Sequence, residues 1–377
     1  MHKIELMYSL AGREGGGRSI RNPLIEMLQA VRECGSISAA AKALELSYRH
    51  VWGELKRWER ELGQPLIVWE KGQRARLSEF GDKLLWAERQ AQARLAPQIE
   101  ALHADLERAF AVAFDEQAHV LMLFASHDNA LAALREHAAS NARLHLDIRF
   151  CGSVDAIAAM NEGRCVMAGF HTTPGAAPGS LAQRTYQPLL QPGRHKLIAF
   201  ARRTQGLMVA RANPLRLASI ADVVRTQARF VNRSLGTGTR LLLDQWLEQA
   251  HVRPADVRGY DHQEPSHAAV AQTVASGSAD VALGIAAAAH SRGLDFVPLA
   301  QEDYYLVCLK EALQLPPVQS LLAVLHDPAW REQLGALPGY EPLACGEVLS
   351  LRRQLPWWQF ARPRRGGQAV KKSVNTS

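Results

Sequence analysis

The 377-residue sequence has no apolar run of about 18 residues, the length that a membrane-spanning helix requires. Its first residues, MHKIELMYSLAGREGGGR, lack the apolar stretch and the small-residue cleavage site of a secretory signal peptide. Cysteine is scarce and scattered: the five residues at positions 34, 151, 165, 308 and 345 form no Cys-x-x-Cys or Cys/His spacing. The sequence therefore predicts a cytoplasmic protein without a disulfide framework, a metal site or a cofactor.

Acidic residues are missing from the C-terminal segment. Residues 351–377 carry seven Lys/Arg and no Asp/Glu, so this segment alone equals the formal net charge of +7. The basic balance of the whole chain is therefore not by itself a sign of a nucleic-acid partner. We expect a solvated, disordered basic tail at 351–377, with nonspecific DNA contact as the alternative, and a flexible N-terminus at 1–18.

Three short helical patterns and a hairpin follow the N-terminus. NPLIEMLQAVRECG has a regular apolar face and a Gly stop, SISAAAKALEL begins at a Ser cap, and SYRHVWGELKRWEREL forms a third helix. PLIVWEK, GQRA and RLSEF then read as a small hairpin. The order predicts a winged helix-turn-helix over 19–80, with a helical docking module as the alternative. A linker and dimerisation helix is expected over 78–114, interrupted near Pro97.

The third helix of such a domain must reach base edges and phosphates, so its N-terminal residues should be polar. Basic residues in the hairpin suit phosphate or minor-groove contact. The candidate DNA-binding residues are Ser36, Ser38, Ser47, Tyr48, Arg49, His50, Trp52, Lys56, Arg57, Lys71, Arg74 and Arg76.

The head also resembles a known family. The segment GSISAAAKALELSYRHVWGELKRWERELGQPLIVWEKGQRARLSEFGDKLL is similar to the N-terminal domain of molybdate-responsive (ModE-type) regulators, and more distantly to LysR-type regulators. The resemblance covers about residues 20–90 and implies a homodimer or higher homo-oligomer paired through the long helix. The hairpin is shorter than in the ModE-type family and lacks its longer Gly-rich loop.

From about residue 118 the pattern changes to short apolar runs that alternate with helices, which predicts parallel sheets covered by helices. FVNRSLGTGTRLLLDQW, GYDHQEPSHAAVAQTVASGSADVALGI and LDFVPLAQEDYYLVC resemble the periplasmic-binding-protein-like domain found fused to such heads. The resemblance implies a type II two-lobed α/β domain over 118–350. Lobe I is expected over about 118–200 and 291–350, and lobe II over about 205–290.

The loop FVNRSLGTGTR, residues 230–240, looks at first like a phosphate cradle of a nucleotide-hydrolysing enzyme. A P-loop requires GxxxxGK[ST], but Thr239 and Arg240 follow Gly238, so the Lys is missing. A dinucleotide fingerprint requires a third Gly where Leu241 stands. What remains is a Gly-rich turn at a helix N-terminus, whose free N–H groups and dipole favour an anion. A tight turn with a capping Thr is the alternative.

FASHDN, FCGSVD and GFHTT offer similar strand-to-helix junctions, which should converge on a cleft because ligands bind beyond the carboxyl ends of parallel strands. His127, His171, Glu264, Ser266 and Tyr304 have equally plausible structural roles as caps, packing residues or solvated groups. The candidate ligand-binding residues are Ser126, His127, Asp128, Ser153, His171, Thr172, Asn232, Arg233, Ser234, Gly236, Thr237, Gly238, Thr239, Arg240, Glu264, Ser266, His267 and Tyr304.

These patterns predict a one-component transcription regulator and not an enzyme. A dimeric head reads an operator in double-stranded DNA, while the two-lobed domain closes on a small anionic effector, with molybdate or tungstate as the leading candidate. One alternative is the same regulator sensing a small organic acid or a molybdenum-cofactor-like molecule. The other is an enzyme on a binding-protein scaffold that uses Ser126, His127 and Asp128, although sequence neighbours point in different directions.

Overall fold

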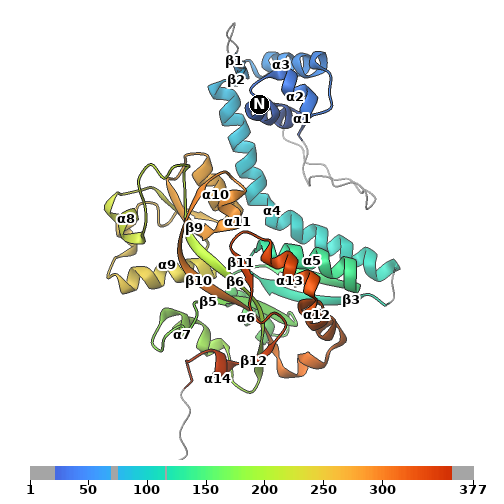
Figure 1. The fold of residues 1–377 in the computed structure, drawn as a ribbon, viewed down its shortest axis with the longest axis vertical. Helices are drawn as coiled ribbons and strands as arrows, with labels where there is room; N and C mark the ends of the chain where they lie inside the picture. The colour runs from blue at the N-terminus through green and yellow to red at the C-terminus, as the bar shows by residue number, and fades with distance from the viewer. Residues whose placement is uncertain (1–21, 69–74, 115–116, 359–377) are drawn as a thin grey trace, which may run out of the picture.

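A computed structural model of the chain describes residues 22–68, 75–114 and 117–358. A small helical head is joined by one long helix to a larger two-lobed α/β domain (Figure 1). The predicted flexible N-terminus at 1–18, the wing residues Lys71 and Arg74, and the basic segment from 359 onward lie outside the described residues. No helix of the described chain is both long and apolar enough to cross a membrane.

The head consists of three helices and a two-stranded antiparallel hairpin. Its elements are α1 Pro23–Cys34, α2 Ile37–Ala43, α3 Tyr48–Leu62, β1 Ile67–Val68 and β2 Arg76–Leu77. Side-chain caps fix where each helix begins: Asn22, Ser36 and Ser47 accept hydrogen bonds from backbone N–H groups of the first turn. Gly35 ends α1 in the left-handed conformation with φ 64°. The predicted helix-turn-helix is therefore confirmed.

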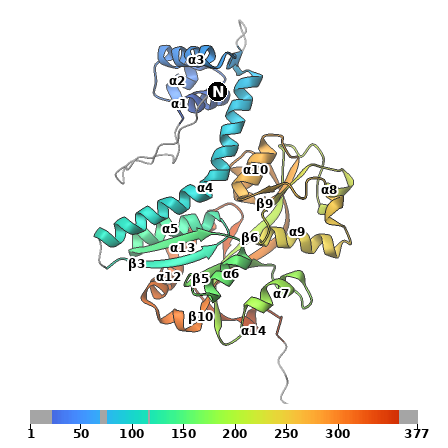
Figure 2. The ribbon, with the colours of Figure 1, turned by 180° about the vertical axis from the view of Figure 1, so that it is seen from behind.

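The linker helix α4, Glu79–Phe114, contains Pro97. Proline has no N–H, so Pro97 cannot donate to the carbonyl of Ala93 one turn earlier. The hydroxyl of Ser266 in the two-lobed domain donates to that carbonyl instead, with an oxygen–oxygen distance of 3.3 Å. Figures 1 and 2 show α4 bent between its two halves. The interruption expected near Pro97 is thus a bend in a continuous helix, as proline commonly produces.

Within the described residues, ten strands form one strongly curled sheet in the order β4-β3-β5-β10-β6-β9-β7-β8, with β11 and β12 against β6. The strands are β3 His119–Ala125, β4 Leu144–Phe150, β5 Met167–Thr172, β6 His195–Val209, β7 Phe230–Arg233, β8 Gln263–Glu264, β9 Val281–Ile285, β10 Asp295–Leu309, β11 Tyr340–Pro342 and β12 Val348–Ser350. β3 pairs in parallel with β4 and β5, and β7 with β8 and β9, as predicted.

The antiparallel strands β6 and β10 run through both lobes and connect them. The first half of β6 lies in lobe I, whereas residues 205–209 pair with β9 in lobe II. β10 takes the opposite course: residues 295–298 pair with the lobe II half of β6, and residues 303–308 pair with β5 of lobe I. The predicted return to lobe I at residue 291 is therefore too early, because the chain first completes lobe II.

Helices cover both faces of the sheet (Figure 2). The larger helices are α5 Asn129–Ala142, α6 Ser153–Asn161, α7 Leu181–Tyr186, α8 Ile220–Arg225, α9 Gly238–Gln249, α10 His267–Ala275, α11 Ala286–His290, α12 Pro316–His326 and α13 Pro328–Gly335. One apolar core joins α5, α12 and α13 of lobe I with α10 and α11 of lobe II. Separate cores lie beneath α6 and α7 in lobe I, and beneath α8 and α9 in lobe II.

The beginning of the predicted basic tail is part of the fold. α14, Leu351–Gln354, follows β12, and Leu351, Leu355 and Trp357 are buried in the core of lobe I. The indole of Trp357 donates to the carbonyl of Ala176 at 3.0 Å. The expectation of a disordered tail from residue 351 is therefore wrong up to residue 358, because apolar side chains in this segment complete the core.

Candidate nucleic-acid interface and interlobe cleft

The N-terminal end of α3 presents polar and aromatic side chains to solvent. Tyr48, Arg49 and His50 are exposed, and the Tyr48 ring stacks on Trp52 with ring centroids 6.3 Å apart. Ser36 and Ser47 act as helix caps, while Ser38 is exposed on α2 and Arg76 on β2. The exposed end of α3 is the part of the head that can meet base edges in a major groove.

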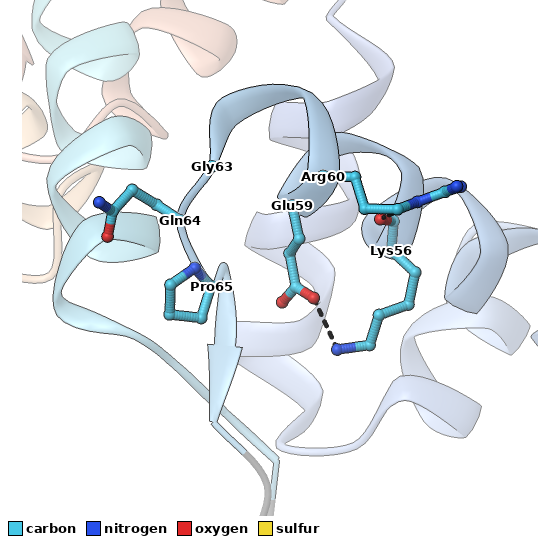
Figure 3. A pocket seen from close by; sticks show the side chains of 6 residues that line it. All are labelled: Lys56, Glu59, Arg60, Gly63, Gln64 and Pro65. Carbon is cyan, nitrogen blue, oxygen red and sulfur yellow. Dashed lines mark hydrogen bonds and ion pairs between the residues drawn. The ribbon is translucent and has the colours of Figure 1, made fainter.

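The basic residues further along α3 already have partners. Lys56 pairs with Glu59 at 2.6 Å and lies over the Trp52 ring, and Arg57 pairs with Glu54 at 2.6 Å. Figure 3 shows the Lys56–Glu59 pair beside a hollow of about 360 Å³ at the end of α3. Partial burial raises the pKa of Glu59, but hydrogen bonds from Lys56 and from the Leu66 and Ile67 amides outweigh this effect and lower it. Glu59 thus ties α3 to the hairpin, and Lys56 is less available for DNA than predicted.

The two lobes are in contact across the cleft. A Cβ atom placed on Gly152 of lobe I would lie 2.8 Å from the carbonyl oxygen of Gly236 in lobe II. A Cβ atom placed on Gly238 would lie 3.2 Å from the Cβ atom of His171 in lobe I. At the rim, Arg184 of α7 forms an ion pair with Glu248 of α9 at 2.7 Å. The structure therefore shows the lobes closed, with backbone against backbone.

A buried charge network crosses the base of the cleft. Arg203 of β6 donates to Asp128 at 2.5 Å and to Glu302 of β10 at 3.0 Å. Gln205 donates to Glu302 at 2.8 Å and to Thr239 of lobe II at 2.9 Å. Burial works against the charged form, but Glu302 and Asp128 keep the pKa of Arg203 above its usual value. Arg203 is thus a neutralised structural cation at the hinge.

Arg233 is different, because it has no carboxylate partner among the described residues. Its side chain lies at the end of β7 and is 2% exposed. One guanidinium nitrogen donates to the main-chain carbonyl of Glu264 at 3.2 Å, and Nε has no partner in the described chain. Burial, and then the nearby charge of Arg203, lower the pKa of Arg233 to about 9, so it is still protonated at neutral pH. A buried, unmatched cation in a cleft is a place for an anion.

Neutral polar rings surround Arg233. Burial, followed by the charges of Arg203 and Arg233, holds the pKa of His171 well below its usual value, and His267 is shifted in the same direction by burial and the same two arginines. The His171 ring lies against Tyr304 with centroids 3.8 Å apart. Both ring nitrogens of His171 and the Tyr304 hydroxyl are buried without a hydrogen-bond partner in the described part of the chain. Neutral His171 and Tyr304 therefore each have one hydrogen-bond donor without a partner in this part of the structure.

Hydroxyls and helix N-termini complete the cleft. The hydroxyl oxygens of Ser126 and Ser153 lie 3.4 Å apart in lobe I, and Ser153 is in the first turn of α6. Thr239 occupies the first turn of α9 in lobe II, and Thr172 is buried at the end of β5. No helix directly follows GFHTT, contrary to expectation, because β5 leads into a turn. The helices α6 and α9 nevertheless point their N-termini toward the facing lobe.

Several predicted ligand residues instead have structural partners. Asp128 caps α5 and binds Arg203 and the Tyr340 hydroxyl, so its carboxylate belongs to the hinge network and not to a catalytic triad. Arg240 pairs through Nε with Asp244 at 3.2 Å and covers the Tyr260 ring, so its charge is already matched, while its Nη1 has no partner in the described chain. Asn232 and Ser234 hydrogen-bond to main-chain carbonyls of lobe II, and Thr237 caps α9.

Glu264 and Ser266 were expected in the cleft, but both bind α4. Arg94 of α4 donates to both carboxylate oxygens of Glu264, at 2.6 to 3.1 Å, and Gln90 donates to Glu264 at 3.1 Å. Ser266 caps α10 and donates to Ala93. Their contacts depend on where α4 docks, which the local sequence does not encode.

The sequence patterns do not single out the hinge residues Arg203, Gln205 and Glu302. They lie in the middle of two 15-residue strands that cross between the lobes. The polar stretches RRTQ and QED interrupt the apolar pattern, so each strand was expected to stop there. The available signal was that both interruptions are flanked by strand-forming residues on either side.

Comparison with known proteins supports this architecture. Residues 134–326 match the model of the PBP superfamily domain, and residues 24–82 match the bacterial regulatory helix-turn-helix of the lysR family. The chain is 33% identical over 201 residues to YvgK of Bacillus subtilis (strain 168). The alignment covers 53% of this chain and 64% of YvgK, so the chain spans less than two thirds of that relative. It is 32% identical over 111 residues to a protein in the ferredoxin 2Fe-2S gene 5′ region of Clostridium pasteurianum, covering 29% of this chain and 98% of that relative.

Among solved structures, ArgP from Mycobacterium tuberculosis is similar over 81% of this chain and 96% of that chain, with 18% identity and a TM-score of 0.38. The predicted order, an N-terminal helix-turn-helix followed by a two-lobed periplasmic-binding-protein-like domain, is confirmed by the family matches. The molybdate-responsive subtype stays a prediction.

Proposed function

Because the chain belongs to the PBP superfamily over residues 134–326 and carries a lysR-family helix-turn-helix over residues 24–82, we propose that it is a one-component transcription regulator. The head binds double-stranded DNA, and the cleft between the lobes binds a small anionic effector. The observation that carries the second part is Arg233, a buried guanidinium with no carboxylate partner in the described chain. Effector binding shifts a population of lobe arrangements, which requires different affinities for the open and closed forms.

The surroundings of Arg233 favour an oxyanion. One positive charge, neutral imidazole and phenol donors, serine and threonine hydroxyls and the N-termini of α6 and α9 lie around the same cleft. Such a set offers hydrogen bonds in several directions, which suits a tetrahedral ion. We therefore propose molybdate or tungstate as the effector.

The closeness of the lobes limits the size of the effector. The approach of Gly152 to Gly236 leaves no room between the two loops even for an added methyl group. A molecule of the size of a molybdenum cofactor would need these two backbones to move further apart than a small ion would. This contact supports the oxyanion over the larger ligand.

We also propose that the chain forms a homodimer through α4. Leu95, Leu102 and Leu106 are 37%, 58% and 39% exposed and follow one another at intervals of seven and four residues. That spacing places them along one face of the helix, as in a helix–helix seam. Pairing two heads through this face would present two recognition helices to one operator.

A thermal-shift series on the full chain tests the effector. Molybdate and tungstate should stabilise the protein by about 2.7 kcal/mol at a hundredfold excess over Kd. Sulfate, phosphate, acetate and a dicarboxylate should give smaller shifts at the same concentration. No shift with any oxyanion at millimolar concentration would refute the oxyanion, and a shift with carboxylates alone would identify an organic acid instead.

A further inference from the structure

The linker helix docks on lobe II beside its bend. Arg94 holds the carboxylate of Glu264 through both of its oxygens, with a shortest distance of 2.6 Å. Gln90, one turn earlier, donates both to Glu264 and to Thr273 of α10, each at 3.1 Å. Glu264 is 1% exposed and the Arg94 side chain is 53% exposed, so the pair lies at the edge of the contact between α4 and lobe II. Its bidentate, charge-assisted geometry fixes the relative position of the two side chains.

The bend in α4 is itself part of this docking. Pro97 leaves the Ala93 carbonyl without its helical donor, and the Ser266 hydroxyl fills that place. Ala93 is 2% exposed because lobe II covers it. The helix therefore bonds to lobe II through its main chain as well as through the side chains of Gln90 and Arg94.

Beyond the bend, α4 belongs to lobe I. Asp105 pairs with Arg149 of β4 at 3.0 Å. One helix is thus tied to lobe II by the turns before Pro97 and to lobe I by the turns after it. A change in the angle between the lobes must either bend α4 further or release one of the two attachments.

Glu264 lies between the cleft and α4. Its main-chain carbonyl accepts hydrogen bonds from Arg233 at 3.2 Å and from the Ser234 hydroxyl at 3.3 Å. Its side chain, on the same residue, holds Arg94 and Gln90. A ligand that binds the Arg233 guanidinium therefore competes with or shifts its hydrogen bond to the Glu264 carbonyl, and Glu264 is the residue that holds the linker helix.

We propose that Glu264 couples the effector cleft to the DNA-binding head, by joining Arg233 through its main chain to Arg94 of the linker helix through its side chain. The proposal rests on the proposed anion site at Arg233. Effector binding closes the lobes and secures α4 on lobe II, which sets the direction in which the head projects. Glu264 is a positioning residue in this scheme and does not touch the effector.

Hydrogen–deuterium exchange of the full chain, with and without sodium molybdate, tests the coupling. In the wild type, molybdate should slow exchange in the cleft segments 152–157 and 236–241 and in the α4 segment 88–97. In Glu264→Gln the cleft should remain protected by molybdate, while the added protection of residues 88–97 should be lost. Arg94→Ala removes the same ion pair by changing its half-exposed partner, and molybdate should likewise fail to protect residues 88–97 in this variant. It provides the test if Glu264→Gln does not fold.

Arg164→Ala is the matched control, because it also removes an exposed arginine from an ion pair, the one with Glu162 between α6 and β5, and it should give the wild-type pattern. If molybdate still protects residues 88–97 in both variants, Glu264 does not couple the two sites. If molybdate protects no cleft segment even in the wild type, the anion site fails and the coupling to it fails with it. Ligand-free Arg94→Ala should also exchange faster over 88–97 than the wild type, and equal rates would refute the docking itself.

Discussion

Arg203 and Arg233 share the buried space between the lobes, and only Arg203 is matched by carboxylates in the described chain. The two residues have opposite consequences for stability. Arg203 holds β6, β10 and the start of α5 together, whereas Arg233 adds an unmatched charge that folding must dehydrate. Because Arg233 has no carboxylate partner in the described chain, an anion bound beside it should stabilise the closed cleft.

Replacing Arg233 separates ligand binding from folding. In Arg233→Gln the molybdate-induced stabilisation, about 2.7 kcal/mol at a hundredfold excess over Kd, should be lost. The ligand-free variant should unfold at the same temperature as the wild type or above it, because an uncompensated buried charge has been removed. Thermal unfolding with and without molybdate measures both effects. Arg240→Gln removes a guanidinium that Asp244 already pairs, and it should keep the ligand response.

A methyl group at position 152 should oppose closure. Gly152 has φ −63°, which alanine adopts without strain, but the new Cβ would lie 2.8 Å from the Gly236 carbonyl oxygen. In Gly152→Ala we expect a weaker molybdate response and little change in ligand-free stability, because the lobes can stay slightly open. Small-angle scattering should show a less compact two-lobed domain. An unchanged ligand affinity would mean that full closure is not needed for binding.

Acid should destabilise the ligand-free protein through two histidines. Burial, and then the neighbouring arginines, lower the pKa of His171 and His267 in the folded state. Below the ordinary histidine pKa of about 6.5 the unfolded chain therefore binds protons that the folded chain refuses. The free energy of unfolding is fully retained above that pH. It decreases as the pH drops below that value, by up to about 1.36 kcal/mol per pH unit for each histidine. Urea unfolding from pH 7.5 to 5 should show a shallower decline in His171→Asn, and parallel curves would contradict this assignment.

Arg49 and Lys56 should contribute unequally to DNA binding. Arg49 is exposed at the start of α3, while Lys56 is paired with Glu59 and lies over Trp52. If Arg49 contacts a base, Arg49→Ala should weaken the free energy of specific binding by about 1–3 kcal/mol. If Arg49 contacts a phosphate, the slope of log binding constant against log salt concentration should become smaller by about one. Lys56→Ala should have a smaller effect. Fluorescence anisotropy with a duplex from the upstream region of the gene, at several salt concentrations, distinguishes these outcomes.

The architecture was predictable because it depends on local patterns. Apolar runs of strand length alternate with helical stretches from residue 118, and Ser36, Ser47 and Thr237 each cap the helix that follows them. The missing Lys at the loop 230–240 predicts that this loop is not a P-loop. Arg233 was among the residues predicted for the cleft, although the sequence could not separate it from Arg240.

The remainder of the site depends on long-range placement. Arg240 differs from Arg233 only because Asp244 and Tyr260 meet it in space. Arg203 and Glu302 are polar residues inside long strands, where periodicity predicts an end to the strand and not a hinge. Trp357 stands in a basic segment, and its burial becomes apparent only once the core of lobe I is assembled around it.

Pro97 gives the linker helix a property that a regular helix lacks. If alanine replaced it, an N–H at position 97 would compete with the Ser266 hydroxyl for the Ala93 carbonyl. Forming that helical hydrogen bond would straighten α4 and would at the same time break its hydrogen bond to Ser266 of lobe II. The same missing hydrogen bond that weakens α4 as an isolated helix therefore makes its angle dependent on the domain it carries.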